Sequence, residues 1–240
     1  MLFWVLALSA QADVAHVCGT PARLADTIRR TRPSPPPPSP ALVDHEAHGD
    51  ISNTMYSDHF ALKWGSGLGE IPETASRLLA DFEYAHGEMI TSWSMNDPTG
   101  FGGTYFNVYL GDTGDDAPSV MGNAGYYTLD GEGYPMIVLN HELIEDHPYI
   151  RSVIVHEFFH AVQHAELAFF YEDTGSWYWE ATACWASGRL SPEGGSFYGF
   201  LPWYALKPQA GLYHFSFDNH GGQPPDLHQY GAFLFPWYIS

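Results

Sequence analysis

The sequence predicts an α+β fold in which a small mixed β-sheet is followed by a central helix and a helical C-terminal part. Apolar residues recur at helical spacing over 73–93. Three short segments rich in aromatic and β-branched residues follow, separated by Gly and Asp turns. Helical spacing then returns in the second half. A chain of 240 residues with 45% hydrophobic residues can bury a core of this kind.

The first half of the fold is expected to contain one helix and three strands. Pro72 stands just ahead of the helix at 73–93, in a position that suits a first helical turn. The three strands are expected at 104–110, 125–129 and 135–140. The order therefore predicts a helix packed on a small sheet.

Further helices are expected in the second half. One begins near Asp146, whose side chain suits an N-cap, and has Pro148 in its first turn. A shorter helix covers 177–188, with Ser176 as its N-cap. The last segment, 227–240, has the pattern of a helix that Pro236 cuts short.

The N-terminal part has the pattern of targeting and spacer segments. Residues 2–9 are apolar but too few to span a bilayer, and Ala10-Gln11-Ala12 has the small-x-small form of a signal-peptidase site. We therefore expect a signal peptide over 1–12 and a secreted, extracellular protein. Residues 13–55 contain a proline tract and predict a propeptide or Pro-rich linker. A globular domain, truncated at its C-terminus, is expected over 56–240.

The charge balance excludes some classes of partner. Nine Lys and Arg residues against 28 Asp and Glu give a net charge of −19. Such a surface repels phosphate backbones and anionic lipids, so neither nucleic acid nor a membrane is expected as a partner.

The motif that carries chemistry is HEFFH at 156–160. On a helix, residues four apart project from one face, so His156 and His160 can bind two positions of a Zn²⁺ ion. Glu157 then lies beside the metal, where it can take a proton from zinc-bound water and pass it to the leaving amine. The uncharged residues on both sides of the motif are typical of a helix buried beneath a cleft.

A catalytic zinc needs a third protein ligand, and Glu180 is the candidate. It lies 20 residues after His160 in the next predicted helix, among four aromatic residues, where a carboxylate needs a charged partner. Two alternatives remain open. Glu166 follows His160 by six residues, but Gln163 stands where a glycine would have to bend the chain, and His164 is too far along a straight helix.

These residues carry a resemblance to a known family. The spacing of His156, His160 and Glu180 resembles the gluzincin metallopeptidases of the thermolysin-like clan. HEFFHAVQ followed by WYWEATACW is similar to secreted putative metalloproteases of myxobacterial type, and segments 57–64 and 229–240 are more loosely similar. The resemblance implies a zincin-like fold, His156, His160 and Glu180 as zinc ligands, and Glu157 as catalytic base. It also implies that an edge strand, for which we predict 135–140, pairs with an extended peptide.

The chain departs from the family pattern at one position. Many gluzincins have an Asp four residues after the ligand Glu, where it orients the first histidine, and this chain has Cys184 there. Either another group is therefore expected to hold the second ring nitrogen of His156, or the site is weaker than in thermolysin-like enzymes. For the oxyanion, Tyr230 is the candidate donor and His228 the weaker one.

Two further predictions concern Cys18 and an acidic loop. Cys18 lies in the expected propeptide, where its thiolate could occupy the open zinc position and keep a zymogen latent. A disulfide with Cys184 and an unimportant free thiol are the alternatives. The loop GDTGDDAP at 111–118 has clustered carboxylates that could bind Ca²⁺, although such a run is more often a solvated turn.

The sequence thus predicts a secreted zinc endopeptidase that hydrolyses peptide bonds in peptide or protein substrates. Two alternatives remain open. One is a zinc hydrolase acting on a non-peptide amide, and the other is a zinc-stabilised binding module whose peptidase site has decayed. Glu157 discriminates between an enzyme and the binding module, because a purely structural site needs no uncoordinated carboxylate beside its ligands.

Overall fold

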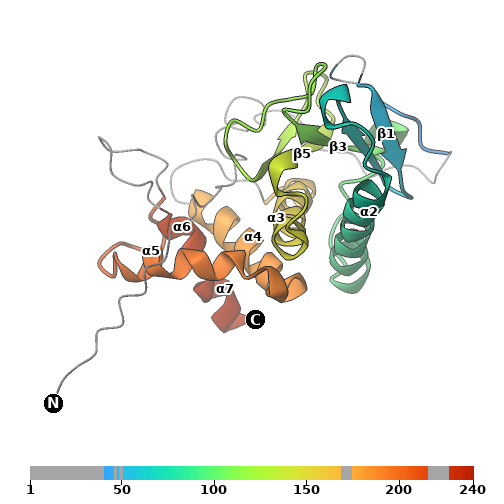
Figure 1. Ribbon diagram of the computed structural model, residues 1–240. Coiled ribbons are helices and arrows are strands. Elements are labelled where there is room, and N and C mark those ends of the chain that lie inside the picture. Colours follow the sequence, from blue (N-terminus) through green and yellow to red (C-terminus); the bar gives the residue numbers. More distant parts are fainter. Residues whose placement is uncertain (1–40, 46–47, 49–50, 169–174, 216–226) are drawn as a thin grey trace.

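The computed structural model describes residues 41–45, 48, 51–168, 175–215 and 227–240 (Figure 1). The strands are β1 (Asn53–Tyr56), β2 (Phe60–Trp64), β3 (Phe106–Gly111), β4 (Gly125–Leu129) and β5 (Pro135–Asn140). The α-helices are α2 (Pro72–His86), α3 (His147–Ala165), α4 (Ser176–Leu190), α5 (Leu201–Ala205), α6 (His228–Gly231) and α7 (Leu234–Ile239). Short helices are η2 (Ser66–Leu68), the π-helix η3 (Gly87–Ser92), η4 (Phe101–Gly103), η5 (His141–Leu143), η6 (Pro192–Gly194) and η7 (Ser196–Phe200). The predicted signal peptide, the proline tract and Cys18 lie outside the described residues.

The strands form one mixed sheet in the order β1-β2-β3-β5-β4, which confirms the α+β prediction. β2, β3 and β5 are parallel to one another, and β1 and β4 pair antiparallel at the two ends. The prediction of an edge position for 135–140 is therefore wrong. β5 lies inside the sheet, and β4 is the terminal strand beside it. Strand order depends on pairing between distant segments, which the local pattern does not contain.

One face of the sheet packs against α2 and α3, which lie side by side beneath it in Figure 1. Alternate strand positions point to this face, as the pleat requires. These side chains share a single core with the two helices and include Phe60, Leu62, Phe106, Val108, Ile137, Leu139, Leu78, Phe82, Ile154 and Phe158. The burial of this core holds α3, and with it the HEFFH motif, in a fixed position under the sheet.

The opposite face of the sheet is covered by residues that precede β1. Lys63 of β2 is fully buried there, and its Nζ lies 2.8 Å from Oδ1 of Asp44 and donates to the carbonyl oxygen of His45 at 2.9 Å. Nδ2 of Asn107 donates to the same carbonyl at 2.7 Å. The expected boundary at residue 56 is thus a few residues too late: β1 begins at Asn53, and part of the expected linker belongs to the folded domain.

Several predicted elements are confirmed. β4 and β5 have the predicted bounds, and the helix predicted at 73–93 divides into α2 and the π-helix η3. α3 begins one residue after Asp146, whose side chain accepts from the backbone N–H of Tyr149 at 3.4 Å. β2 was not predicted. It is buried along its whole length, so its sequence lacks the apolar–polar alternation that marks a strand with one exposed face.

The C-terminal helices pack on α3 through α4, which crosses α3 in Figure 1. Two local predictions are wrong here. Gly175, and not Ser176, is the N-cap of α4, and it makes no side-chain cap bond. Pro236 does not end a helix but lies in the first turn of α7, where its missing N–H costs no hydrogen bond. The break falls between α6 and α7 instead.

Within the described residues, no helix is both long enough and apolar enough to cross a membrane.

Candidate metal centre

Helix α3 carries the motif through the middle of the molecule. It packs against α2, the sheet and α4, so that nearly all residues from Ile150 to His164 are buried. His156 and His160 lie one turn apart on the face toward α4, and their rings meet edge to face at 4.7 Å. Phe158 lies on the opposite side, in the core with α2. The helix therefore separates a polar face toward α4 from an apolar face toward the sheet.

Helix α4 brings Glu180 to the two histidines. Oε2 of Glu180 lies 3.1 Å from Nε2 of His156 and 3.6 Å from Nε2 of His160, and the two Nε2 atoms are 3.1 Å apart. Ligands about 2.0–2.1 Å from a tetrahedral zinc stand about 3.3 Å from one another. The three predicted ligand atoms therefore already have the mutual spacing of a zinc site.

The charges at this centre also fit a cation. Glu180 is fully buried, and its Oε1 has no hydrogen-bond partner among the described residues. In the described part of the chain it forms ion pairs only with His156 and His160. Burial raises the pKa of Glu180, but the charges of the histidines and their hydrogen bonds outweigh burial and hold that pKa low. A buried, ionised carboxylate facing two imidazole nitrogens is the donor set that Zn²⁺ binds.

The outer ring nitrogens of both histidines have partners. Nδ1 of His160 contacts Oε1 of Gln163 at 2.7 Å, and Nε2 of Gln163 donates to Oγ1 of Thr182 at 2.7 Å and to the carbonyl of Trp179 at 3.2 Å. An Nδ1–H donated to Gln163 leaves Nε2 of His160 with the lone pair that a metal needs. Gln163 therefore ties α3 to α4 at the ligand itself.

The second nitrogen of His156 meets Cys184, the residue at the departure from the family pattern. Sγ of Cys184 lies 3.8 Å from Nδ1 of His156. Cys184 is a buried free cysteine, and burial raises the pKa of its thiol well above the ordinary value. The sulfur is thus a neutral, weak acceptor for Nδ1–H, which corrects the expectation that another residue holds this nitrogen.

A small cavity of about 40 Å³ lies beside the ligands. Glu157 and His156 line it from α3, and Tyr230 lines it from α6, with its ring stacked 6.3 Å from that of His156. Tyr149 and Ala124 complete the wall nearest the sheet. The volume suits one or two water molecules. The structure thus brings Tyr230 to the centre, while its role as oxyanion donor stays a prediction.

The other candidate residues lie elsewhere. Both carboxylate oxygens of Glu166 accept from Asn96, at 2.6 Å from its N–H and 2.8 Å from its Nδ2. Nδ1 of His164 lies 2.6 Å from the hydroxyl of Tyr127, on the side of α3 toward the sheet. His228 stacks on Tyr204 instead of lining the cavity. Glu166 and His164 are therefore not ligands in this arrangement.

The acidic loop at 111–118 gains no support as a calcium site. Asp112 accepts from the N–H of Val120, and Asp115 accepts from Ser52 and Ser66. The carboxylates thus bind different parts of the chain instead of converging. Calcium at this loop stays a prediction that the geometry does not strengthen.

Sequence reasoning missed Gln163 and Tyr149 as residues of the centre. Gln163 follows His160 by three residues and Tyr149 precedes His156 by seven, so both lie on the ligand face of α3. That spacing was the available signal. Burial raises the pKa of Tyr149 to about 12, with the charges of Asp146 and Glu157 adding to the shift, so its hydroxyl stays protonated at neutral pH.

Comparison with known proteins leaves the family open. No protein-family model, no curated protein and no solved structure matches this chain.

Proposed function

We propose that this protein is a zinc-dependent endopeptidase. The observation that carries the proposal is the convergence of His156, His160 and the fully buried Glu180, with Glu157 lining a cavity beside them. A structural zinc site is usually closed by four protein ligands, whereas a catalytic one has three and an open position. Three ligands and an adjacent carboxylate match the catalytic kind.

Bound zinc would polarise the scissile carbonyl and lower the pKa of the attacking water. Glu157 then takes a proton from that water and gives it to the leaving amine, which requires a carboxylate beside the ligands and not among them. Gln163 and Cys184 hold the two imidazoles in orientation while this happens. Tyr230 and Tyr149, which line the same cavity, are the candidate hydrogen-bond donors to the oxyanion.

Strand β4 is the proposed binding edge for an extended peptide. It is the terminal strand of the sheet, and its first residue, Gly125, lies against Glu157: a Cβ there would be 3.3 Å from Cγ of Glu157. A substrate backbone paired with this edge would pass the catalytic carboxylate. The role that the sequence assigned to 135–140 thus moves to 125–129.

The zincin-like fold, the gluzincin relationship and secretion form the wider part of the proposal. The resemblance of HEFFHAVQ and WYWEATACW supports the first two, and the expected signal peptide at 1–12 supports the third. The acidic surface favours peptide or protein substrates over nucleic acid.

The substitution Glu157→Gln tests the proposed chemistry. The variant keeps the shape of the side chain but cannot take a proton, so we expect zinc content to be unchanged and cleavage of an unstructured protein such as casein to fall about 10²–10⁴-fold. Glu166→Gln is the matched control, because Glu166 lies at the end of the same helix but contacts Asn96.

Three results would contradict the proposal in different ways. Equal cleavage by wild type and Glu157→Gln would remove Glu157 from the mechanism. Zinc binding without any peptidase activity in wild type would favour a binding module. Hydrolysis confined to small non-peptide amides would favour the amidohydrolase alternative.

A further inference from the structure

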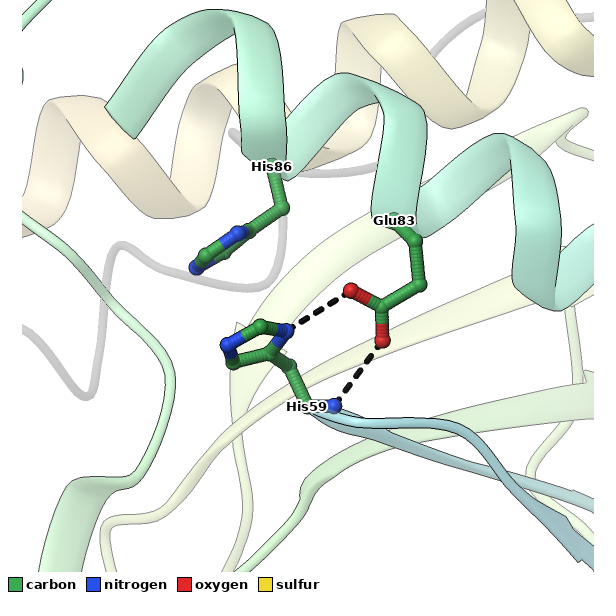
Figure 2. Close-up of side chains that lie close together, drawn as sticks. All are labelled: His59, Glu83 and His86. Atoms are coloured by element: carbon green, nitrogen blue, oxygen red, sulfur yellow. Dashed lines mark hydrogen bonds and ion pairs between the residues drawn. The ribbon is translucent and has the colours of Figure 1, made fainter. Parts of the chain in front are cut away.

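A second cluster of metal-ligating side chains lies where β2 begins and α2 ends. His59 precedes β2, whereas Glu83 and His86 lie three residues apart near the end of α2 and so share one helix face. One nitrogen or oxygen from each residue lies within 4.8 Å of the others. Figure 2 shows the two imidazole rings one above the other, with the Glu83 carboxylate beside His59; the ring centroids are 3.9 Å apart.

The Glu83 carboxylate is fixed by one oxygen and faces the cluster with the other. Oε1 accepts from the hydroxyl of Ser57 at 2.6 Å and from the backbone N–H of His59 at 2.9 Å. Oε2 lies 2.7 Å from Nδ1 of His59 (Figure 2). A carboxylate anchored in this way is oriented before any ion arrives, as metal ligands commonly are.

Asp97 repeats this arrangement at the second histidine. Its Oδ1 accepts from the N–H of Thr99 at 2.8 Å and from the Thr99 hydroxyl at 2.7 Å, and its Oδ2 lies 3.3 Å from Nε2 of His86. An Nε2–H donated to Asp97 leaves Nδ1 of His86 with its lone pair. Carboxylate–histidine pairs of this kind orient metal-binding imidazoles.

The cluster holds two carboxylates, Glu83 and Asp97, which face two imidazoles. In the described part of the chain, Glu83 and Asp97 form ion pairs only with histidines and with no Lys or Arg. A bound divalent cation would supply positive charge to these two carboxylates.

We propose that His59, Glu83 and His86 form a second metal site, which binds a divalent transition-metal ion of the Zn²⁺ type and is oriented by Asp97. Imidazole and carboxylate together are the ligands that such ions accept. The ion would tie the start of β2 to the end of α2, at the junction with the π-helix η3, a kind of distortion common at functional sites.

This site is separate from the centre at His156. The ring of His86 lies 6.1 Å from that of Phe158, which points to the α2 side of α3, whereas His156 and His160 point to α4. The two sites therefore lie on opposite sides of α3, and substitutions at one do not touch ligands of the other.

A metal count on the full chain tests the proposal. The protein is stripped with a chelator, and Zn²⁺ is then titrated by calorimetry, with bound zinc counted after dialysis. We expect two zinc ions in wild type, one in His86→Phe and one in His156→Ala.

Phe at 86 keeps the stacking with His59 and the contacts with Phe60 and Phe158 but offers no ligand atom. His147→Phe is the matched control, because His147 pairs with Asp81 of α2 where Arg151 also contributes charge, and it should keep two.

The outcomes separate this site from the proposed active centre. If His86→Phe does not fold by circular dichroism, Glu83→Gln decides, and we expect it to weaken binding of one of the two ions at least tenfold. A folded His86→Phe or Glu83→Gln that binds Zn²⁺ as wild type does would overturn the proposal. The cluster would then be no more than two hydrogen-bonded pairs, His59 with Glu83 and His86 with Asp97. Loss of one ion in His86→Phe but none in His156→Ala would uphold this site and refute the proposed function instead.

Discussion

Gln163 and Cys184 contact the ring nitrogens of His160 and His156 that point away from Glu180. The two contacts differ in strength, since an amide oxygen at 2.7 Å is a good acceptor and a thiol sulfur at 3.8 Å is a weak one. Each fixes which nitrogen is left for the metal. The quality of the centre therefore depends on residues that bind no metal themselves.

Gln163→Ala is expected to weaken zinc binding at the His156 centre by about 10- to 100-fold, the usual effect of losing a partner of a ligand histidine. Cys184→Ala should produce a smaller loss because the contact it removes is weaker. Competition titration with a chromogenic chelator measures both. Equal losses in the two variants would show that hydrogen bonding to the imidazoles is not what sets the affinity.

The cluster of His156, His160 and Glu180 could be predicted from sequence, because the helix fixes the relative positions of the two histidines. His156 and His160 follow from the four-residue spacing, and Glu180 follows from the cost of a carboxylate among aromatic residues. Cys184 was noted as a departure from a pattern and as an alternative disulfide partner of Cys18, but not as a contact of His156. That its sulfur meets His156 depends on how α4 crosses α3, which no local pattern contains.

At the level of elements, strand β4 and helix α3 meet at Gly125. A Cβ at this position would lie 3.0 Å from the carbonyl oxygen of Val138, 3.2 Å from Cγ1 of Val153 and 3.3 Å from Cγ of Glu157. Such contacts are too tight to be accepted without a shift of a few tenths of an ångström. The glycine thus sets how closely the terminal strand approaches the Glu157 side chain.

Gly125→Ala is expected to lower kcat by about 10-fold or more, because small displacements of catalytic groups are costly. Zinc content should be unchanged, since no ligand is moved directly. Gly131→Ala, in the turn between β4 and β5 with no atom within 4 Å of the added Cβ, should behave as wild type. Assay of peptide hydrolysis with zinc analysis of each variant gives the comparison. Full activity in Gly125→Ala would argue against the proposed position of Glu157 in catalysis.

Local patterns predicted strands and helices better than they predicted strand order. β4 and β5 were found with their bounds, because the Gly/Asp turn at 130–133 separates them. The edge position expected for 135–140 was wrong, since β5 also pairs with the distant β3. β2 was missed because one of its buried residues is Lys63, which pairs with Asp44 outside the expected domain.

For the molecule as a whole, the segment before β1 is part of the fold. Asp44 and the carbonyl of His45 hold the buried ammonium of Lys63 on the face of the sheet opposite α2 and α3. A buried ammonium that loses its carboxylate partner is costly. The expected linker therefore ends before Asp44, and Asp44 and His45 help to stabilise the sheet.

Asp44→Ala is expected to lower the free energy of unfolding by about 1–3 kcal/mol, the usual cost of removing a partner from a buried charged group. Asp116→Ala removes the same charge from the exposed acidic loop and should change stability little. Urea unfolding followed by circular dichroism measures both. A loss in Asp44→Ala no larger than in Asp116→Ala would mean that the segment only lies on the sheet without stabilising it.

The central claim is that His156, His160 and Glu180 hold one zinc ion. Elemental analysis of zinc per chain, on wild type and on His156→Ala purified without chelators, tests it most directly. We expect the variant to be folded and to contain one zinc ion fewer than wild type. Equal zinc in the two proteins, or none in a folded wild type supplied with zinc, would contradict the claim.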